Sequence, residues 1–171
     1  SLQAGNNLIL KRMKRRHSRE MAISFCNKVL SIRKDTTFGA DLITGFPTET
    51  DKMFRDTLDL VDECNLTHLH VFPYSPRDNT PAALMPQVNK LIIKNRAKIL
   101  RQKGIEKLKK NLAKKVGEED LILIERNENA KSIGKDQNFF NAFFNEEIKQ
   151  GDIVPCVYIG VDNDMLIAKR I

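Results

Sequence analysis

The sequence predicts an α/β domain followed by a small all-β domain. Three observations support this division: helical and strand-like segments alternate over the first part of the chain, a long basic helix follows, and short strand-like segments separated by Asn, Gly and Asp turns fill the rest. We therefore expect an α/β region over residues 1–85, a linking helix over 86–115 and an all-β region over 116–171.

The α/β region has the predicted order helix, strand, helix, strand. Ser18 can cap a helix in which apolar residues then recur at helical spacing. The run TTFGADLITGFP is typical of a strand buried on both faces. Thr48 and Asp51 resemble a capping box for the next helix, and THLHVF is the second strand. Strands that alternate with helices indicate a parallel sheet or barrel.

Two loops leave the carboxyl ends of these strands, over residues 45–49 and 73–77. Because ligands of parallel α/β folds bind at the carboxyl ends of strands, we expect Gly45 and Tyr74 to lie close together at one edge. Asp41, in an apolar strand, must be hydrogen-bonded or face the barrel interior. His68 and His70 alternate with apolar residues, and we interpret them as polar residues lining that interior because no further metal ligands accompany them.

A long basic helix is predicted from Pro86 to about Lys115, with a bend at Gly104. After it, the runs DLILIE, NFFNAFFN, DIVPCVYIG and MLIAKR predict the strands of a small β-barrel. In NFFNAFFN, alternation places Phe140, Ala142 and Phe144 on a core face. Phe139 and Phe143 share the other face, where half-buried packing and stacking on unpaired bases are both open.

Charge is distributed unevenly along the 171 residues. The chain has a net charge of +7, with 9 basic and 1 acidic residue over 1–34 and 11 basic and 1 acidic over 90–115. The two remaining segments are net acidic. Dense basic blocks favour a polyanionic partner such as nucleic acid, although solvated faces are the simpler alternative.

The sequence lacks a membrane-spanning segment and a cysteine cluster, and both absences limit the kinds of protein it can encode. No apolar run approaches the roughly 18 residues of a membrane span, so we expect a soluble, cytoplasmic protein without membrane contact. Cys26, Cys64 and Cys156 are spaced too widely for a metal cluster or a disulfide framework, and we expect them to be reduced and mostly buried.

Three motifs in this order carry a resemblance to a known family. SLQAGNNLILKRMKRRHS, ADLITGFPTET and HVFPYSPRDNTPAA, followed by a small β-domain, resemble the radical S-adenosylmethionine methylthiotransferases. HVFPYSPR in particular resembles the branch that adds a methylthio group to N6-threonylcarbamoyladenosine beside the tRNA anticodon. The resemblance covers the whole chain. It implies the C-terminal part of a radical-SAM partial (β/α) barrel followed by a TRAM domain, a small RNA-binding barrel.

The resemblance also implies a cofactor site. In the full family enzyme, S-adenosylmethionine and a 4Fe-4S cluster carry the chemistry, and the cluster is held by Cys-x-x-x-Cys-x-x-Cys. This chain lacks that motif, so we assign it no catalytic residue and no metal ligand and expect it to be inactive alone. We interpret Thr48, where a Gly is common in the family, as a helix cap. The residues expected near the cofactor are Gln3, Gly5, Ile43, Gly45, Phe72 and Tyr74.

The implied substrate is tRNA. The residues expected to contact it are Arg77, Lys11, Arg15, Arg16, Lys94, Arg101, Phe139 and Phe143. Two hypotheses follow: a portion of a methylthiotransferase, whose cluster-binding half could come from a separate chain, or a non-catalytic RNA-binding module or degraded remnant. An unrelated α/β protein would leave the three ordered motifs unexplained.

Overall fold

The computed structural model describes all 171 residues, which form two compact units, Ser1–Lys107 and Leu108–Ile171. None of the helices combines the length and apolar composition that crossing a lipid bilayer requires.

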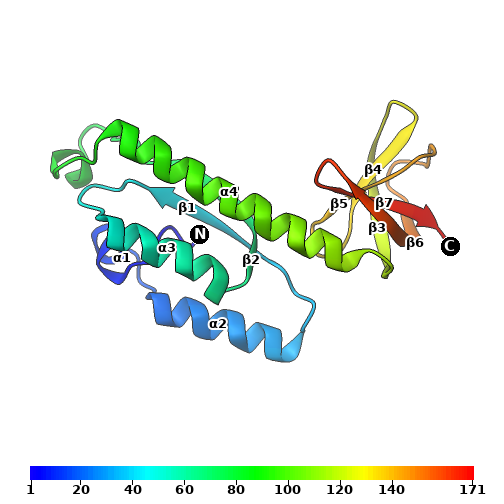
Figure 1. Ribbon diagram of the computed structural model, residues 1–171, viewed down its shortest axis with the longest axis horizontal. Coiled ribbons are helices and arrows are strands. Elements are labelled where there is room, and N and C mark those ends of the chain that lie inside the picture. Colours follow the sequence, from blue (N-terminus) through cyan, green and yellow to red (C-terminus); the bar gives the residue numbers. More distant parts are fainter. The chain divides into compact units, whose positions relative to one another are not determined.

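The first unit is a small α/β domain built on parallel strands (Figure 1). Strands β1 (Phe38–Thr44) and β2 (Leu66–Pro73) pair in parallel, in the order predicted. Residues 1–5 lie along the other edge of β1, where Gln3 bridges to Leu42 in parallel. Two paired strands do not by themselves close a barrel. The helical elements are α1 (Asn7–Arg12), α2 (Arg19–Ile32), α3 (Asp51–Glu63), η1 (Pro81–Leu84) and most of α4 (Lys90–Lys115).

The helix caps agree with the sequence at one position and differ at another. The Ser18 hydroxyl accepts a hydrogen bond from the Met21 N–H and caps α2, as predicted. Helix α3 is capped by Thr50, which accepts from the Met53 N–H, so the predicted Thr48 cap is wrong. Thr48 instead has φ +70°, a left-handed backbone that favours glycine. Thr48 and Thr50 are two residues apart, and the sequence around each is compatible with a helix cap.

The helices cover one face of the sheet and leave the other uncovered. Leu42 on β1 and Val71 on β2 are buried under them, at 0% and 8% exposure. Because side chains alternate across a strand, the intervening residues point away from the helices. The core of this unit consists of Ala22, Cys26, Ala40, Leu42, Phe54, Leu60, Val61, Cys64, Leu66, Val71, Ala97 and Leu100.

Helix α4 begins after an Asn cap and runs without interruption to Lys115. The Asn89 carboxamide accepts from the Leu91 N–H, so the helix starts four residues later than Pro86. The helix is continuous through Gly104. A Cβ at Gly104 would lie 3.1 Å from a Leu69 methyl group, so the missing side chain allows α4 to pack closely on β2.

The second unit is a closed five-stranded β-barrel with the strand order β3-β4-β5-β7-β6. All pairs are antiparallel except β5 with β7. The strands are β3 (Glu119–Glu128), β4 (Lys131–Lys135), β5 (Asn141–Phe144), β6 (Ile153–Asp162) and β7 (Met165–Arg170). The sequence did not predict β4, because KSIGK shows no strong apolar alternation. The barrel is consistent with the expected TRAM-like domain.

Candidate functional site

The carboxyl ends of β1 and β2 meet at one edge, as predicted. The Tyr74 N–H donates to the Thr44 carbonyl at 2.9 Å, directly after the last register pair of the two strands. The rings of Phe46 and Tyr74 pack edge to face with centroids 5.3 Å apart. The loops that begin at Gly45 and Tyr74 therefore lie side by side.

The uncovered face of the sheet presents an apolar pair and a polar pair. Ile43 lies opposite Phe72, which is 51% exposed. One pleat earlier, Asp41 lies opposite His70, and His70 Nδ1 is 3.3 Å from Asp41 Oδ1. Both polar side chains are partly exposed on this uncovered face. The face thus offers a flat apolar wall beside a carboxylate and an imidazole.

Gln3 borders this face through its backbone. Its N–H donates to the Asp41 carbonyl and its carbonyl accepts from the Ile43 N–H, each at 2.8 Å. Gln3 is buried and has φ +73°, a strained conformation for a side-chain-bearing residue. The residues expected around the cofactor from both neighbouring segments are thus brought against β1.

The two glycines of the expected cofactor site have a packing role. A Cβ at Gly5 would lie 2.3 Å from the Asp56 carbonyl oxygen, and a Cβ at Gly45 would lie 2.3 Å from Ile93 Cγ1. Gly45 also has φ +73°. The close backbone approach that we expected to serve a cofactor is therefore used by helices α3 and α4.

Two buried hydroxyls at the strand ends have no hydrogen-bond partner. They are Thr44 Oγ1 and the Tyr74 hydroxyl. A buried polar group without a partner costs roughly 1–3 kcal/mol, so each hydroxyl favours a polar partner. Thr44 lies on the helix-covered face with Leu42, where a buried water molecule fits that role. The Tyr74 ring packs with the apolar cluster of Ala4, Ile9, Leu10 and Phe46, and its hydroxyl is buried there without a partner.

A buried ion pair that sequence analysis missed fixes the loop after β1. Glu49 Oε2 accepts from the Gly45 N–H at 2.8 Å and from Arg96 Nη1 at 2.7 Å. Arg96 Nη2 reaches Asp51 at 2.7 Å, and its guanidinium lies over the Phe54 ring. Burial raises the pKa of the Glu49 carboxyl despite the nearby Arg96.

The sequence did contain a signal for this pair. Arg96 falls among the apolar residues of α4 that face the core, beside Ala97 and Leu100. A charged residue in such a stripe requires a buried partner of opposite charge. Glu49, which follows a buried strand, was available to provide it.

The basic residues expected to contact RNA are distributed over several surfaces. Arg77 lies in the loop after β2, and Lys11, Arg15 and Arg16 lie at and after α1. All four are exposed. Lys94 and Arg101 line a shallow groove along α4, where Arg101 Nη2 donates to the Val71 carbonyl at 2.9 Å. The structure does not gather all six basic residues into one patch.

The two candidate stacking residues in the barrel differ in exposure. Phe139 is 72% exposed and has φ +62°, whereas Phe143 is 5% exposed and lies under the Lys131 ammonium at 4.2 Å from its ring centre. The predicted core face of Phe140, Ala142 and Phe144 is confirmed, since all three are at most 1% exposed. Only Phe139 presents an aromatic face to solvent.

The turn that carries Phe139 is held by a buried acid. Asp136 Oδ1 accepts from the Asn138 and Phe140 N–H groups, each at 2.9 Å. Its other oxygen accepts from the Tyr158 hydroxyl at 3.2 Å and lies 3.1 Å from Lys115 Nζ. The strand therefore begins at Asn141, after this turn.

The cysteines are divided between two cores. Cys26 and Cys64 lie in the core of the first unit and Cys156 in the barrel core. Burial raises the pKa of all three thiols, to about 12 for Cys64 and about 11 for Cys156. No group of three or more His, Cys, Asp or Glu side chains is placed to hold a metal ion. These residues do not fit a cluster site.

Comparisons with known proteins agree on one kind of relative. The chain is 46% identical over 162 residues to the threonylcarbamoyladenosine tRNA methylthiotransferase MtaB of Rickettsia prowazekii (strain Madrid E), a match covering 95% of this chain. It is 34% identical over 171 residues, or 99% of the chain, to a tRNA-2-methylthio-N(6)-dimethylallyladenosine synthase of Rickettsia rickettsii (strain Sheila Smith). No protein-family model matches.

A third match is restricted to one part of the chain. A synthase of the same name from Psychrobacter cryohalolentis is 47% identical over 85 residues, or 50% of this chain. The matches cover 38% of the Rickettsia prowazekii protein and 36% of the Rickettsia rickettsii protein, so the chain spans well under half the length of these relatives.

Proposed function

We propose, from the premise that this chain belongs to the methylthiotransferase family, that it is the C-terminal portion of a tRNA methylthiotransferase. The substrate we assign is N6-threonylcarbamoyladenosine next to the anticodon. The motif HVFPYSPR supports that branch, and so does the 46% identity to the Rickettsia prowazekii protein. The reaction would use S-adenosylmethionine and an iron–sulfur cluster.

One observation carries the proposal: the uncovered face of β1 and β2 has the features of half a nucleoside site. Ile43 and Phe72 form an apolar wall against which a flat base can lie. The unpartnered Tyr74 hydroxyl lies at the adjacent edge, whereas Thr44 shares the helix-covered face with Leu42. These residues fit the adenosyl part of S-adenosylmethionine, which would supply the methyl group and the radical chemistry when bound.

In this proposal, the residues of this chain bind and orient S-adenosylmethionine, and they do not carry out the reaction alone. Ile43 and Phe72 would hold the base. The Glu49–Arg96 pair would keep the Gly45 loop in place through the Gly45 N–H. The cysteines, buried in two separate cores, do not fit an iron–sulfur cluster. The cluster-binding half would come from elsewhere, in the same polypeptide or a separate chain.

The barrel would contribute RNA contacts as a TRAM domain. Phe139 is the residue we assign to stacking on an unpaired base, because its ring is exposed on a strained turn. Arg77, Lys11, Arg15 and Arg16 would contribute phosphate contacts. The buried ring of Phe143 supports a packing role more than a stacking role.

Nuclear magnetic resonance titration of the chain with S-adenosylhomocysteine tests the cofactor half of the proposal. We expect shift changes at Ile43 and Phe72, and Phe72→Ala should abolish them because it removes the exposed wall. Leu84→Ala, which truncates an apolar side chain that is 90% exposed in η1, is the matched control and should leave the titration unchanged. Shift changes confined to other surfaces would contradict the proposal.

A second candidate function is a non-catalytic RNA-binding module. The basic blocks over 1–34 and 90–115 favour it, together with cysteines that are all buried. It predicts salt-dependent tRNA binding with no response of Ile43 or Phe72 to S-adenosylhomocysteine. The same titration therefore separates the two functions.

A further inference from the structure

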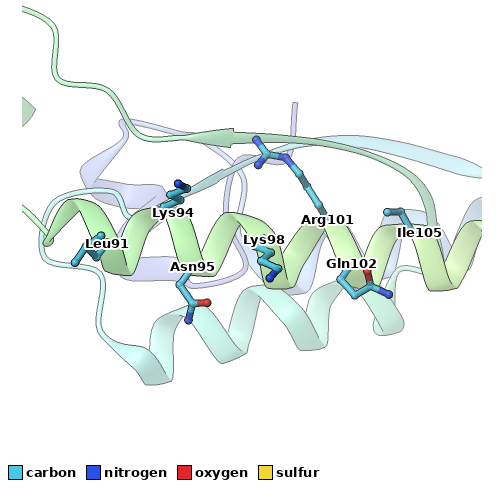
Figure 2. Close-up of a pocket in the computed structure, with 7 residues that line it drawn as sticks. All are labelled: Leu91, Lys94, Asn95, Lys98, Arg101, Gln102 and Ile105. Atoms are coloured by element: carbon cyan, nitrogen blue, oxygen red, sulfur yellow. The ribbon is translucent and has the colours of Figure 1, made fainter.

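A groove of about 530 Å³ runs along the exposed side of α4 within the first unit. Figure 2 shows Lys94 and Arg101 extending to the side of the helix where β2 runs, whereas Asn95 and Gln102 extend to the side of α3. Lys98 lies between them, and Leu91 and Ile105 lie at the two ends. The lining contains three cations, two amides and two apolar residues.

The cations of this groove are not used in ion pairs. No Asp or Glu lines the groove, and neither Lys94 nor Lys98 has an acidic partner. Five other basic residues of α4 are paired: Arg96 with Glu49 and Asp51, Lys103 and Lys107 with Asp62, Lys109 with Asp164, and Lys115 with Asp120 and Asp136. Lys90, Lys110 and Lys114 are exposed and unpaired, but they lie outside the groove. The paired residues thus serve the fold, while the groove keeps free positive charge.

The spacing of these cations gives a linear track. Lys94, Lys98 and Arg101 are four and three residues apart, so they lie on one stripe of the helix, about 10 Å long at 1.5 Å per residue. Arg101 is held by its hydrogen bond to the Val71 carbonyl, which leaves the rest of its guanidinium available. A row of fixed cations matches a chain of phosphates.

We propose that this groove binds a segment of RNA backbone, with phosphates on Lys94, Lys98 and Arg101. The inference rests on the proposed function only in taking RNA as the partner. An amphipathic helix of an acidic protein would need a continuous apolar seam. Here Leu91 and Ile105 are about 21 Å apart along the helix, with Lys94, Lys98 and Arg101 between them. The exposed Ile92 and Ile99 lie outside the groove, on the flank of α4 that adjoins α3. Phosphates require no such continuity.

The groove is a different site from the uncovered sheet face. Helix α4 packs on the opposite face of the sheet, where Ala97 and Leu100 share a core with Leu42 and Val71. The groove lysines therefore lie on a different side of the unit from Ile43 and Phe72, whereas Arg101 reaches the backbone of β2 at the Val71 carbonyl. Phosphate contacts in the groove hold the RNA backbone and increase affinity without entering the reaction.

The test compares two charge-matched double variants on the same helix. Lys94→Gln with Lys98→Gln removes two groove cations, and Lys110→Gln with Lys114→Gln removes two exposed cations outside it. Fluorescence anisotropy measures binding of the full chain to an anticodon stem-loop between 50 and 200 mM salt. Circular dichroism verifies that both variants are folded.

We expect the groove variant to reduce the slope of log affinity against log salt by about 1.4, at about 0.7 per lost phosphate contact. Its affinity at 0.1 M salt should fall about 25-fold by the same relation. The control variant should keep the wild-type slope. Equal losses in both variants would overturn the proposal, because binding would then depend on net charge and not on the groove.

Two further outcomes would also overturn it. The groove variant could lose binding to polyglutamate while RNA binding persists, which would identify an acidic protein as the occupant. If the wild-type chain does not bind the RNA at all, RNA is not the ligand of the groove. Failure of the cofactor titration alone leaves the salt slopes unaffected, so the two proposals fail separately.

Discussion

Replacing Arg96 by Met tests how the loop of the candidate site is held. The substitution removes the guanidinium that pairs with Glu49 and Asp51 but keeps an unbranched side chain of similar length. The Glu49 side chain is 1% exposed, so it would remain buried with the Gly45 N–H as its one remaining hydrogen-bond donor.

The expected loss of stability is large because a buried carboxylate loses its charge partner. Breaking a buried ion pair from one side costs about 3–5 kcal/mol. The matched control is Lys103→Met on the same helix, whose partner Asp62 is 57% exposed. Exposed pairs contribute about 0–1 kcal/mol, so the two variants should differ several-fold in their effect on the free energy of unfolding.

The assay is urea unfolding of the full chain, followed by circular dichroism. Hydrogen exchange at the Gly45 amide reports locally on the first unit. Burial raises the pKa of the Glu49 carboxyl in the folded state above its ordinary value of 4.5. The protonated carboxyl therefore contributes fully to the free energy of unfolding below pH 4.5, and this contribution is lost as the pH rises through the folded-state pKa. Without Arg96 this pKa rises further. Acidification should therefore restore part of the stability of Arg96→Met.

A double variant keeps the test decisive if Arg96→Met unfolds. Adding Glu49→Gln removes the buried charge and should recover most of the lost stability, since a neutral amide can still accept from the Gly45 N–H. The reasoning is refuted if Arg96→Met costs no more than Lys103→Met, or if the double variant is less stable than the single one.

Three other predictions concern particular positions. Gly45→Ala should destabilise the first unit by well over 1 kcal/mol in thermal unfolding, because Gly45 has φ +73° and a Cβ there would overlap α4. The control Gly117→Ala should cost about 1 kcal/mol, because Gly117 has φ +92° but open space around it. Equal costs of the two variants would contradict the packing role of Gly45. Lys115→Met should cost the barrel about 3–5 kcal/mol, because the Asp136 side chain is 0% exposed; a loss below 1 kcal/mol would contradict this. Phe139→Gly should stabilise the barrel by about 1 kcal/mol by relieving φ +62° and weaken RNA binding; unchanged RNA affinity would exclude a stacking role.

Much of the first unit follows from local patterns. The buried strand around Leu42, the Ser18 cap and the meeting of Gly45 with Tyr74 all follow from periodicity and from the rule that parallel strands end at one edge. The Thr48 cap failed because two threonines two residues apart compete for the same role. Only the backbone conformation distinguishes them.

The remaining features depend on contacts between distant residues. The Glu49–Arg96 pair joins positions 47 residues apart, and the close packing of Ile93 on Gly45 joins a helix to a loop far from it in sequence. Strand β4 was missed because its pairing partners, and not its own residues, make KSIGK a strand. In the barrel, a turn around Asp136 interrupts NFFNAFFN, which alternation alone does not reveal.

The most direct measurement is a chimera in which this chain replaces the matching segment of the Rickettsia prowazekii relative, assayed by mass spectrometry of tRNA nucleosides. We predict methylthiolated threonylcarbamoyladenosine from the chimera, none from this chain alone, and a strong loss when the chimera carries Phe72→Ala. A folded chimera that forms no methylthiolated nucleoside, under conditions in which the unaltered relative does, would contradict the assignment of this chain to the enzyme.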